Sequence, residues 1–143
     1  MVSFAANPAD RMGGGSHVRQ VERLSCMSGT EDRQARIAVE MVNGSVKSFA
    51  YYSKRKPRTC SVSVARDDAD SRWQDRGRFT VVRTGQGIFL IENRGRGVHF
   101  LFSDVDRAFY CGMEPGTITG TVTVTRGNRA CRVRGLMDAH NEQ

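Results

Sequence analysis

Lysine, proline and tryptophan are scarce in this chain, and long apolar runs are absent. Only three of its 22 basic residues are lysines, and the rest are arginines. No apolar stretch approaches the roughly 20 residues that a membrane-spanning helix needs, which argues against a transmembrane protein. Nothing repeats at the periods of solenoids or propellers. With 143 residues, 38% of them hydrophobic, the chain has the length and composition of one folded domain.

Recognised catalytic motifs are also missing. The chain has no Gly-x-Ser-x-Gly, no His-Glu-x-x-His and no phosphate-cradling loop. Gly85, Gly87, Gly95 and Gly97 do not open a helical pattern, so they do not form a dinucleotide-binding motif. We therefore expect a protein that is not an enzyme and has no cofactor.

Four cysteines, Cys26, Cys60, Cys111 and Cys131, bear on the compartment. Zinc ligands usually lie two to four residues apart, and none of these do, so we expect no metal site. An even number of cysteines in a small chain is typical of two disulfides in an oxidising environment, with free thiols as the alternative. Three pairings are compatible with the sequence. We favour Cys26–Cys60 with Cys111–Cys131, because each would close a short loop between neighbouring strands.

Residues 3–8 resemble the small-residue pattern at a signal-peptidase cleavage site. Ser3 and Ala5 have the required size, and Pro8 follows shortly after. The charged and apolar parts of a signal do not precede them, so an ordinary flexible terminus is the alternative. Together with the cysteines, this pattern predicts a periplasmic or secreted protein whose signal sequence lies outside this chain.

The chain divides into three parts. Residues 1–16 contain Pro8, a glycine run at 13–15 and little that can be buried, so we expect a disordered segment, either native or an added linker. Residues 138–143 are polar and are expected to form a loose tail. Residues 17–137 are expected to fold as a single β domain.

Alternation with period two dominates the middle of the chain. Cys60, Val62 and Val64 would share one face of a strand, and Asn43-Gly44 is typical of a tight hairpin turn. A single helical turn over residues 104–110 is expected to be capped by Asp104. We expect about nine short strands, at residues 18–26, 37–42, 45–52, 60–64, 79–83, 88–92, 98–102, 118–125 and 131–136.

Strands with one apolar and one polar face pair into antiparallel sheets. Such sheets avoid exposed, unpaired edge strands by closing into a barrel or by stacking two sheets. The expected fold is therefore all-β, a small antiparallel meander barrel with two disulfides. A two-sheet sandwich is the alternative.

A basic and aromatic segment lies at residues 51–58. Cations there would hold a phosphate backbone while aromatic rings stack on bases. Pro57 disfavours a regular strand, so we expect an exposed binding loop, with a solvated loop that binds nothing as the alternative. The candidate binding residues are Tyr51, Tyr52, Lys54, Arg55, Lys56 and Arg58.

A second basic run contains Arg94 and Arg96, followed by His99, Phe100 and Phe102. This run resembles the basic and aromatic strands of cold-shock and other OB-type nucleic-acid binders. The resemblance implies a nucleic-acid-binding barrel that uses Arg94 and Arg96. A glycine-rich turn followed by a core strand is the alternative.

Residues 66–76 mix charges of both signs. Asp67, Asp68 and Asp70 offer the oxygen ligands that calcium prefers, but the spacing of an EF-hand loop is absent. Neighbouring arginines neutralise the same carboxylates, so we expect a salt-bridged surface loop without a metal. We expect Trp73 to plug one end of the barrel.

Residues 24–29, Leu-Ser-Cys-Met-Ser-Gly, resemble the first strand of bacterial inhibitors of c-type lysozyme. In that family an early cysteine precedes a turn, and a loop with serine, glycine and tyrosine enters the lysozyme cleft. The resemblance implies a small exported barrel that binds lysozyme. Residues 84–88 form the most similar glycine loop here and lack a tyrosine, so no site residue carries over. A net charge of +7 would also repel a basic lysozyme.

The same charge favours acidic partners, although genomic base composition alone also enriches arginine. We expect an exported, non-catalytic β-barrel binding protein, monomeric and without integral membrane contact. Its partner would be an acidic protein, an envelope polymer or another polyanion. A nucleic-acid-binding barrel and an enzyme of unrecognised type are the alternatives.

Overall fold

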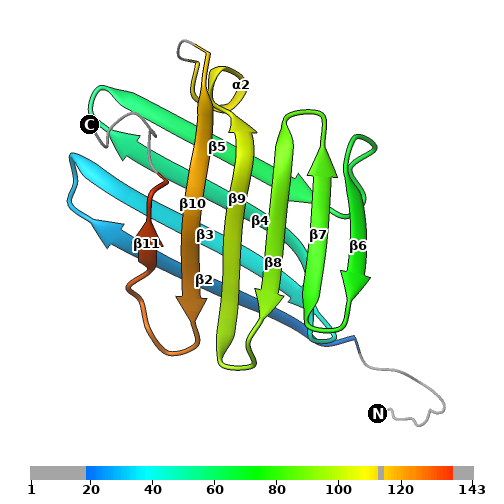
Figure 1. Cartoon of the computed structure of the whole chain (residues 1–143). Coiled ribbons are helices and arrows are strands. Elements are labelled where there is room, and N and C mark those ends of the chain that lie inside the picture. The colour runs from blue at the N-terminus through cyan, green and yellow to red at the C-terminus, as the bar shows by residue number, and fades with distance from the viewer. Residues whose placement is uncertain (1–18, 113–114, 137–143) are drawn as a thin grey trace, which may run out of the picture.

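The computed structural model describes residues 19–112 and 115–136, and these form two antiparallel sheets (Figure 1). One sheet has four strands in the order β2-β3-β4-β5 and the other has six in the order β11-β10-β9-β8-β7-β6. The strands are β2 (Val21–Gly29), β3 (Arg33–Val42), β4 (Ser45–Arg55), β5 (Arg58–Ala65), β6 (Arg72–Arg76), β7 (Phe79–Thr84), β8 (Gly87–Asn93), β9 (Gly97–Asp106), β10 (Thr117–Thr125) and β11 (Arg132–Arg134). A short helix, α2 (Arg107–Cys111), connects β9 to β10.

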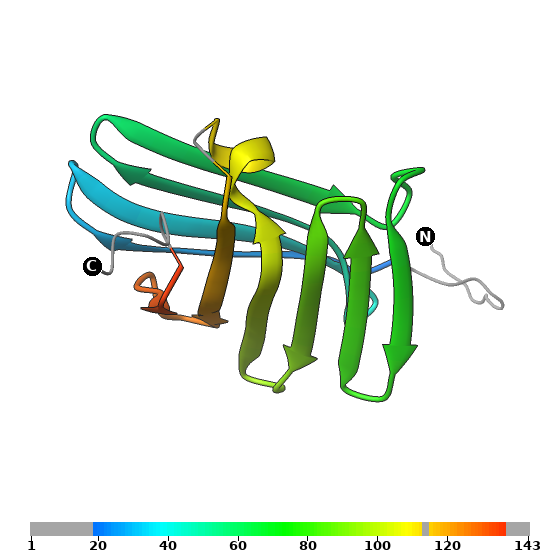
Figure 2. The same ribbon diagram turned by 45° about the horizontal axis from the view of Figure 1, so that its top comes forward.

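The two sheets lie face to face, and their strands cross steeply (Figures 1 and 2). Period-two alternation explains this layering, because each strand presents apolar side chains on one face. In β5, for example, Cys60, Val62 and Val64 are buried while Ser61 and Ser63 are exposed. Sheets of this kind exclude water by packing their apolar faces together.

Aromatic rings from both sheets fill the space between them. Phe49 of β4 contacts Phe100 of β9 at a ring-centroid distance of 5.0 Å. Phe102 lies 5.0 Å from Phe89 and 5.1 Å from Tyr51. All five side chains are almost completely buried. This cluster holds the layers together, since aromatic pairs add to the energy of burial alone.

The prediction of an all-β antiparallel fold with two disulfides is confirmed. Of the two architectures that the sequence left open, the strand pairs form the two-sheet sandwich. One parallel bridge, Met27 with Ala130, links the sheets at the β2 side. Met27 N–H donates to the Arg129 carbonyl at 2.8 Å, so the sandwich is partly closed along this edge.

Two details differ from expectation. Ten strands are present in the described residues instead of about nine, because residues 72–76 form β6 within the segment expected to be a loop. Asp106, not Asp104, caps the short helix, and its carboxylate accepts a hydrogen bond from Phe109 N–H at 3.2 Å. The predictions for residues 1–16 and 138–143 lie outside the described residues.

The disulfides pair differently from the favoured prediction. Cys26 bonds to Cys131 and Cys60 bonds to Cys111, so the Cys26–Cys60 and Cys111–Cys131 pairing is wrong. Cys26 and Cys60 lie on β2 and β5, the opposite edges of the four-stranded sheet. Three strand spacings, roughly 14 Å, separate those edges, which is too far for a direct bond. Each cysteine instead reaches across to the layer of the six-stranded sheet.

Both disulfides therefore join the two layers, one at each edge of the four-stranded sheet. Disulfides persist in oxidising surroundings, so this pattern indicates a compartment outside the reducing cytoplasm. Within residues 19–112 and 115–136, no helix has the length and apolar character required to span a membrane.

Candidate functional site

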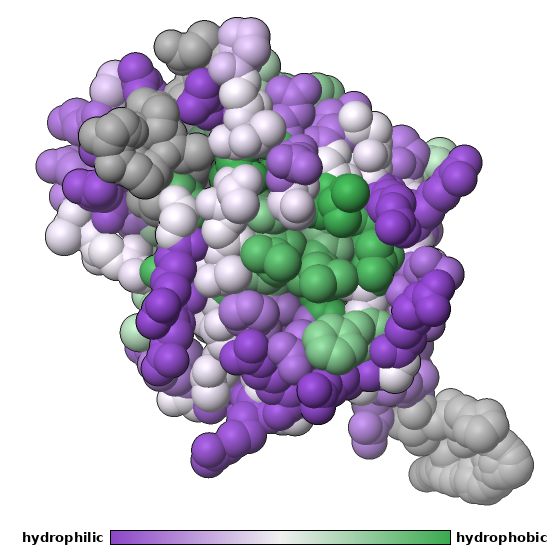
Figure 3. All heavy atoms as spheres, viewed as in Figure 1, coloured by the Kyte–Doolittle hydropathy of each residue, from purple (hydrophilic) through white to green (hydrophobic). Residues whose placement is uncertain are grey.

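The outer face of the six-stranded sheet carries an apolar patch, which we define as Phe79, Val81, Ile88, Leu90 and Leu101. Val81 pairs with Leu90, and Leu90 pairs with Leu101, so these three form a row across β7, β8 and β9. Ile88 and Phe79 flank the row, and each is 37% exposed. Figure 3 shows the patch in green over β7 and β8, open to solvent on this side of the molecule. Exposed apolar clusters of this kind mark interaction surfaces.

Three arginines border the patch, and we call Arg72, Arg76 and Arg83 the arginine rim. All three side chains are exposed, and no hydrogen bond or ion pair to them is found among the described residues. Arg72 and Arg83 are direct cross-strand partners, and Arg76 lies opposite Phe79. Like charges placed opposite each other destabilise a sheet, so this pair lowers stability in the free protein.

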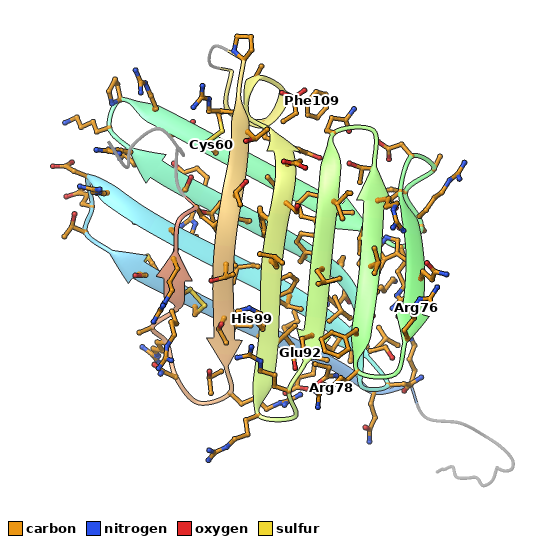
Figure 4. All side chains as sticks on the ribbon, viewed as in Figure 1. Cys60, Arg76, Arg78, Glu92, His99 and Phe109 are labelled. Carbon is orange, nitrogen blue, oxygen red and sulfur yellow. A yellow bond between two sulfur atoms is a disulfide. The ribbon has the colours of Figure 1, made fainter. Side chains whose placement is uncertain are left out.

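A band of polar groups crosses the lower part of the same face (Figure 4). Glu92 accepts a hydrogen bond from Arg94 Nε at 2.9 Å and lies 3.3 Å from Arg78 Nε. These guanidinium groups, with Arg94 first, hold the pKa of the Glu92 carboxyl below its usual value. Arg78 also lies over the Phe79 ring, 5.1 Å from its centroid. Glu92 is therefore already neutralised and does not offset the arginine rim.

His99 is the next residue in this band. Its Nδ1 lies 2.7 Å from the Thr123 hydroxyl, and its cross-strand partner on the other side is Glu92. Partial burial and, secondarily, the charge of Arg94 lower the pKa of His99, while Glu92 acts in the opposite direction. The neutral imidazole is therefore favoured at neutral pH.

The predicted basic segment at residues 51–58 is a hairpin end instead of a loop. Tyr51 is 1% exposed and packs in the core, so its ring is not available on the surface. Tyr52 faces outward and carries the Arg36 guanidinium 4.7 Å from its ring centroid. Lys54 and Arg55 belong to β4, Arg58 begins β5, and Lys56 lies in the turn between them.

The structure does not bring the two predicted basic regions together. Arg94 and Arg96 lie in the β8–β9 turn, and the neighbouring Asn93 amide donates to the Gly44 carbonyl at 2.9 Å. Gly44 precedes the start of β4, whereas residues 54–58 lie at its far end. The 11 residues of β4 span roughly 33 Å. One short nucleic-acid segment would not contact both regions at once.

Residues 66–76 form a corner between β5 and β6 that side-chain contacts hold in place. Arg66 makes two hydrogen bonds to the Asp75 carboxylate, at 2.9 and 2.8 Å, and lies over the Trp73 ring at 4.6 Å. Asp68 accepts from Ala65 N–H at 2.8 Å. In the described part of the chain, no three acidic, histidine or cysteine side chains gather as metal ligands would. Trp73 packs against Phe49 at the border of the core.

The apolar patch and the arginine rim were not predicted as a site. A signal for them exists, because β7 and β8 are apolar on both faces: residues 79–82 and 88–91 contain almost no polar side chain. Only one of those faces meets the other sheet, so the second face is left on the surface. Period-two alternation predicts one exposed polar face for each strand, so it does not reveal a strand with two apolar faces.

Comparison with protein-family models, with curated proteins and with solved structures finds no match to this chain. The resemblances to lysozyme inhibitors and to OB-type nucleic-acid binders therefore remain interpretations of short segments.

Proposed function

We propose that this chain is an exported, non-catalytic binding protein, periplasmic or secreted, that docks an acidic protein on the outer face of its six-stranded sheet. The observation that carries the proposal is the apolar patch bordered by the arginine rim. Arginine and aromatic residues are enriched among the interface positions that contribute most of the binding free energy.

The apolar patch favours a protein partner over a polysaccharide or nucleic acid. A purely charged polymer gains nothing from contact with Val81, Leu90 and Leu101, whose burial contributes only against another apolar surface. A protein with an apolar centre and carboxylates around it satisfies both the patch and the rim. Such carboxylates would also relieve the repulsion between Arg72 and Arg83.

The rigid scaffold supports the same role. Two disulfides join the two layers of the sandwich, and a cross-linked scaffold loses less conformational entropy when a partner binds. Other arginines have carboxylate partners: Arg126 binds Glu22 and Arg66 binds Asp75, each through two hydrogen bonds. The arginine rim has no such partner among the described residues, so carboxylates of an acidic partner would supply its counter-charges.

A matched pair of synthetic peptides tests this proposal. One alternates glutamate with leucine, the other alternates lysine with leucine, and each is titrated into the isotope-labelled protein by NMR. We expect the acidic peptide alone to perturb the amides of β6, β7 and β8, with affinity that falls as salt is added.

Two aspartate substitutions serve as variant and control. Ile88→Asp places a carboxylate in the patch and is expected to weaken binding of the acidic peptide about tenfold or more. Ser63→Asp adds the same charge on the exposed face of the other sheet and should leave binding nearly unchanged. Equal binding of the two peptides, or equal loss in both variants, would contradict the proposal.

A further inference from the structure

A second basic feature lies outside the apolar patch, between the β8–β9 turn and the loop that joins β10 to β11. It is a hollow of about 560 Å³. We name it the basic hollow and define it by six of its lining residues: Arg94, Arg96, Thr123, Thr125, Asn128 and Arg132. Its lining comes from β9, β10, β11 and the turns beside them, and these strands lie at the opposite end of the six-stranded sheet from β6 and β7 (Figure 1).

The lining of the basic hollow consists of donors and positive charges. Arg94 is engaged by Glu92, whereas Arg96 and Arg132 have exposed side chains without a hydrogen bond or ion pair among the described residues. The part of the chain that the structure describes contributes no aspartate or glutamate to the lining. Guanidinium groups bind tetrahedral oxyanions through two parallel hydrogen bonds, which makes arginine the preferred residue for this purpose.

Hydroxyl and amide donors lie beside these arginines. Thr123 is the direct cross-strand partner of Arg132, but its hydroxyl is already in contact with His99 Nδ1 at 2.7 Å. Thr125, the partner of Gly97 next to Arg96, offers its hydroxyl to the hollow. The Asn128 Oδ1 accepts from Ala130 N–H at 2.9 Å, which fixes the orientation of its amide. The opposite end of that amide carries N–H donors, so the same side chain both shapes the loop and offers donors to the hollow.

The loop that borders the hollow is held in place by three independent contacts. The Cys26–Cys131 disulfide ties it to β2. Met27 N–H donates to the Arg129 carbonyl at 2.8 Å. Arg126 makes two hydrogen bonds to Glu22, at 2.6 and 2.8 Å. Donors that are already positioned bind an anion with less loss of entropy than mobile surface arginines do.

We propose that the basic hollow binds one tetrahedral oxyanion, a phosphate or sulfate group, through Arg96 and Arg132 with help from the Thr125 hydroxyl. This site is separate from the acidic-protein docking face and does not depend on it. The anion is expected to be part of a larger ligand or free in solution, and the chemistry that recognises it is the same in both cases.

The direct test is an NMR titration of the full chain with inorganic phosphate and with inorganic sulfate, at ionic strength held constant with sodium chloride. We expect saturable shifts at the amides of Gly97, Thr125 and Asn128 with either oxyanion and none with chloride. O-phosphoserine and a sulfated glucosamine then distinguish a phosphorylated side chain from a sulfated sugar as the source of the group.

Single-charge variants locate the binding. Arg96→Ala and Arg132→Ala should each weaken oxyanion binding about tenfold, which is the effect expected for one charge-assisted hydrogen-bond pair. Arg72→Ala removes the same charge from the arginine rim, so it should weaken the acidic peptide and leave the oxyanion unaffected. Far-ultraviolet circular dichroism verifies that all three variants fold.

Two results would overturn this inference. One is binding of phosphate and sulfate no stronger than that of chloride. The other is an equal effect of Arg72→Ala, Arg96→Ala and Arg132→Ala, which would reveal only general attraction to a positive protein. Because the acidic peptide is read at β6 to β8 and the oxyanion at β9 to β11, failure of one proposal is separable from failure of the other.

Discussion

At the scale of single residues, some arginines of this protein hold the sheets together, whereas others are left to bind. Arg66 joins β5 to β6 through Asp75, Trp73 and the Val46 carbonyl, which its Nε reaches at 2.7 Å. Arg126 joins β10 to β2 through Glu22. Lysine would not replace either, because its ammonium lacks the planar fork that binds a carboxylate with two bonds. The many arginines therefore serve the sandwich as well as its surface.

His99 gives this protein a weak dependence of stability on pH. Its pKa is lower in the folded state than the roughly 6.5 of an unfolded chain, chiefly because of burial and then because of Arg94. The unfolded chain consequently binds the proton more readily. The stability contributed by the neutral ring is complete above pH of about 6.5 and is lost as the pH falls through that value toward the lower folded pKa.

We expect His99→Gln to flatten the decrease in melting temperature between neutral and mildly acidic pH. Thermal unfolding at several pH values measures this slope in both proteins. Glu92, Glu22 and Asp75 also have lowered pKa values, but their carboxyls lose their contribution only at more acidic pH. If the melting temperature of His99→Gln falls with pH as steeply as that of the original protein, above the range in which these carboxyls titrate, His99 does not cause the decrease.

At the scale of elements, alternation predicts individual strands well where one of their faces is polar and exposed. Residues 60–64 and 118–125 alternate cleanly and form β5 and β10 as expected. β6 was missed because its five residues, Arg-Trp-Gln-Asp-Arg, include a single apolar side chain. An edge strand needs only one neighbour, and charged side chains protect its free edge from aggregation. Tertiary contact, not local composition, makes this segment a strand.

The same limit applies to the candidate sites. Arg94 and Arg96 were recognised from their spacing, but Arg132 joins them only because β11 pairs with β10. Tyr51 and Tyr52 look equivalent in sequence, yet adjacent residues of a strand point to opposite faces, so one is core and the other is surface. Which of the two faces is buried depends on where the second sheet lies.

A glycine in β10 tests how closely the last two strands pack. A Cβ added at Gly120 would lie 2.2 Å from the Arg134 carbonyl oxygen and 2.4 Å from the Leu136 nitrogen, at a φ of +153° that side chains rarely adopt. We expect Gly120→Ala to lower the free energy of unfolding by about 1–3 kcal/mol. Chemical denaturation measures the difference.

Gly85→Ala is the matched control for that substitution. Nothing lies within 4 Å of a Cβ added there, and its φ is not positive, so stability should change little or rise slightly. Equal stability of the two alanine variants would mean that β11 does not approach β10 as closely as described.

At the scale of the whole molecule, the two disulfides are covalent cross-links between the two layers. The bonded residues are separated by 105 and 51 positions along the chain. Closing loops of such length restricts the unfolded chain, and in the chain-entropy model each contributes about 4 kcal/mol. The second closure contributes less than the first, because the two loops are nested. A small sandwich with one exposed apolar face gains from this support, since that face adds nothing to the core.

The sequence does not determine how the four cysteines pair, because the pairing depends on how the two sheets pack. A preference for short loops predicts bonds between cysteines that are close in sequence. Packing of the two layers instead brings together cysteines that are far apart in sequence. Cys26 and Cys60 belong to one sheet, and their partners belong to the other layer. The number of cysteines predicted two bonds, and only the packing of sheets decides which two.

The central claim is that the two disulfides each join one layer of the sandwich to the other, and a disulfide map tests it most directly. Tryptic digestion of the unreduced protein, followed by mass spectrometry, should yield residues 24–33 linked to residues 130–132, and residues 59–66 linked to residues 108–126. Each linked pair should separate on reduction. Residues 24–33 linked to residues 59–66, or four free thiols in the native protein, would contradict the account.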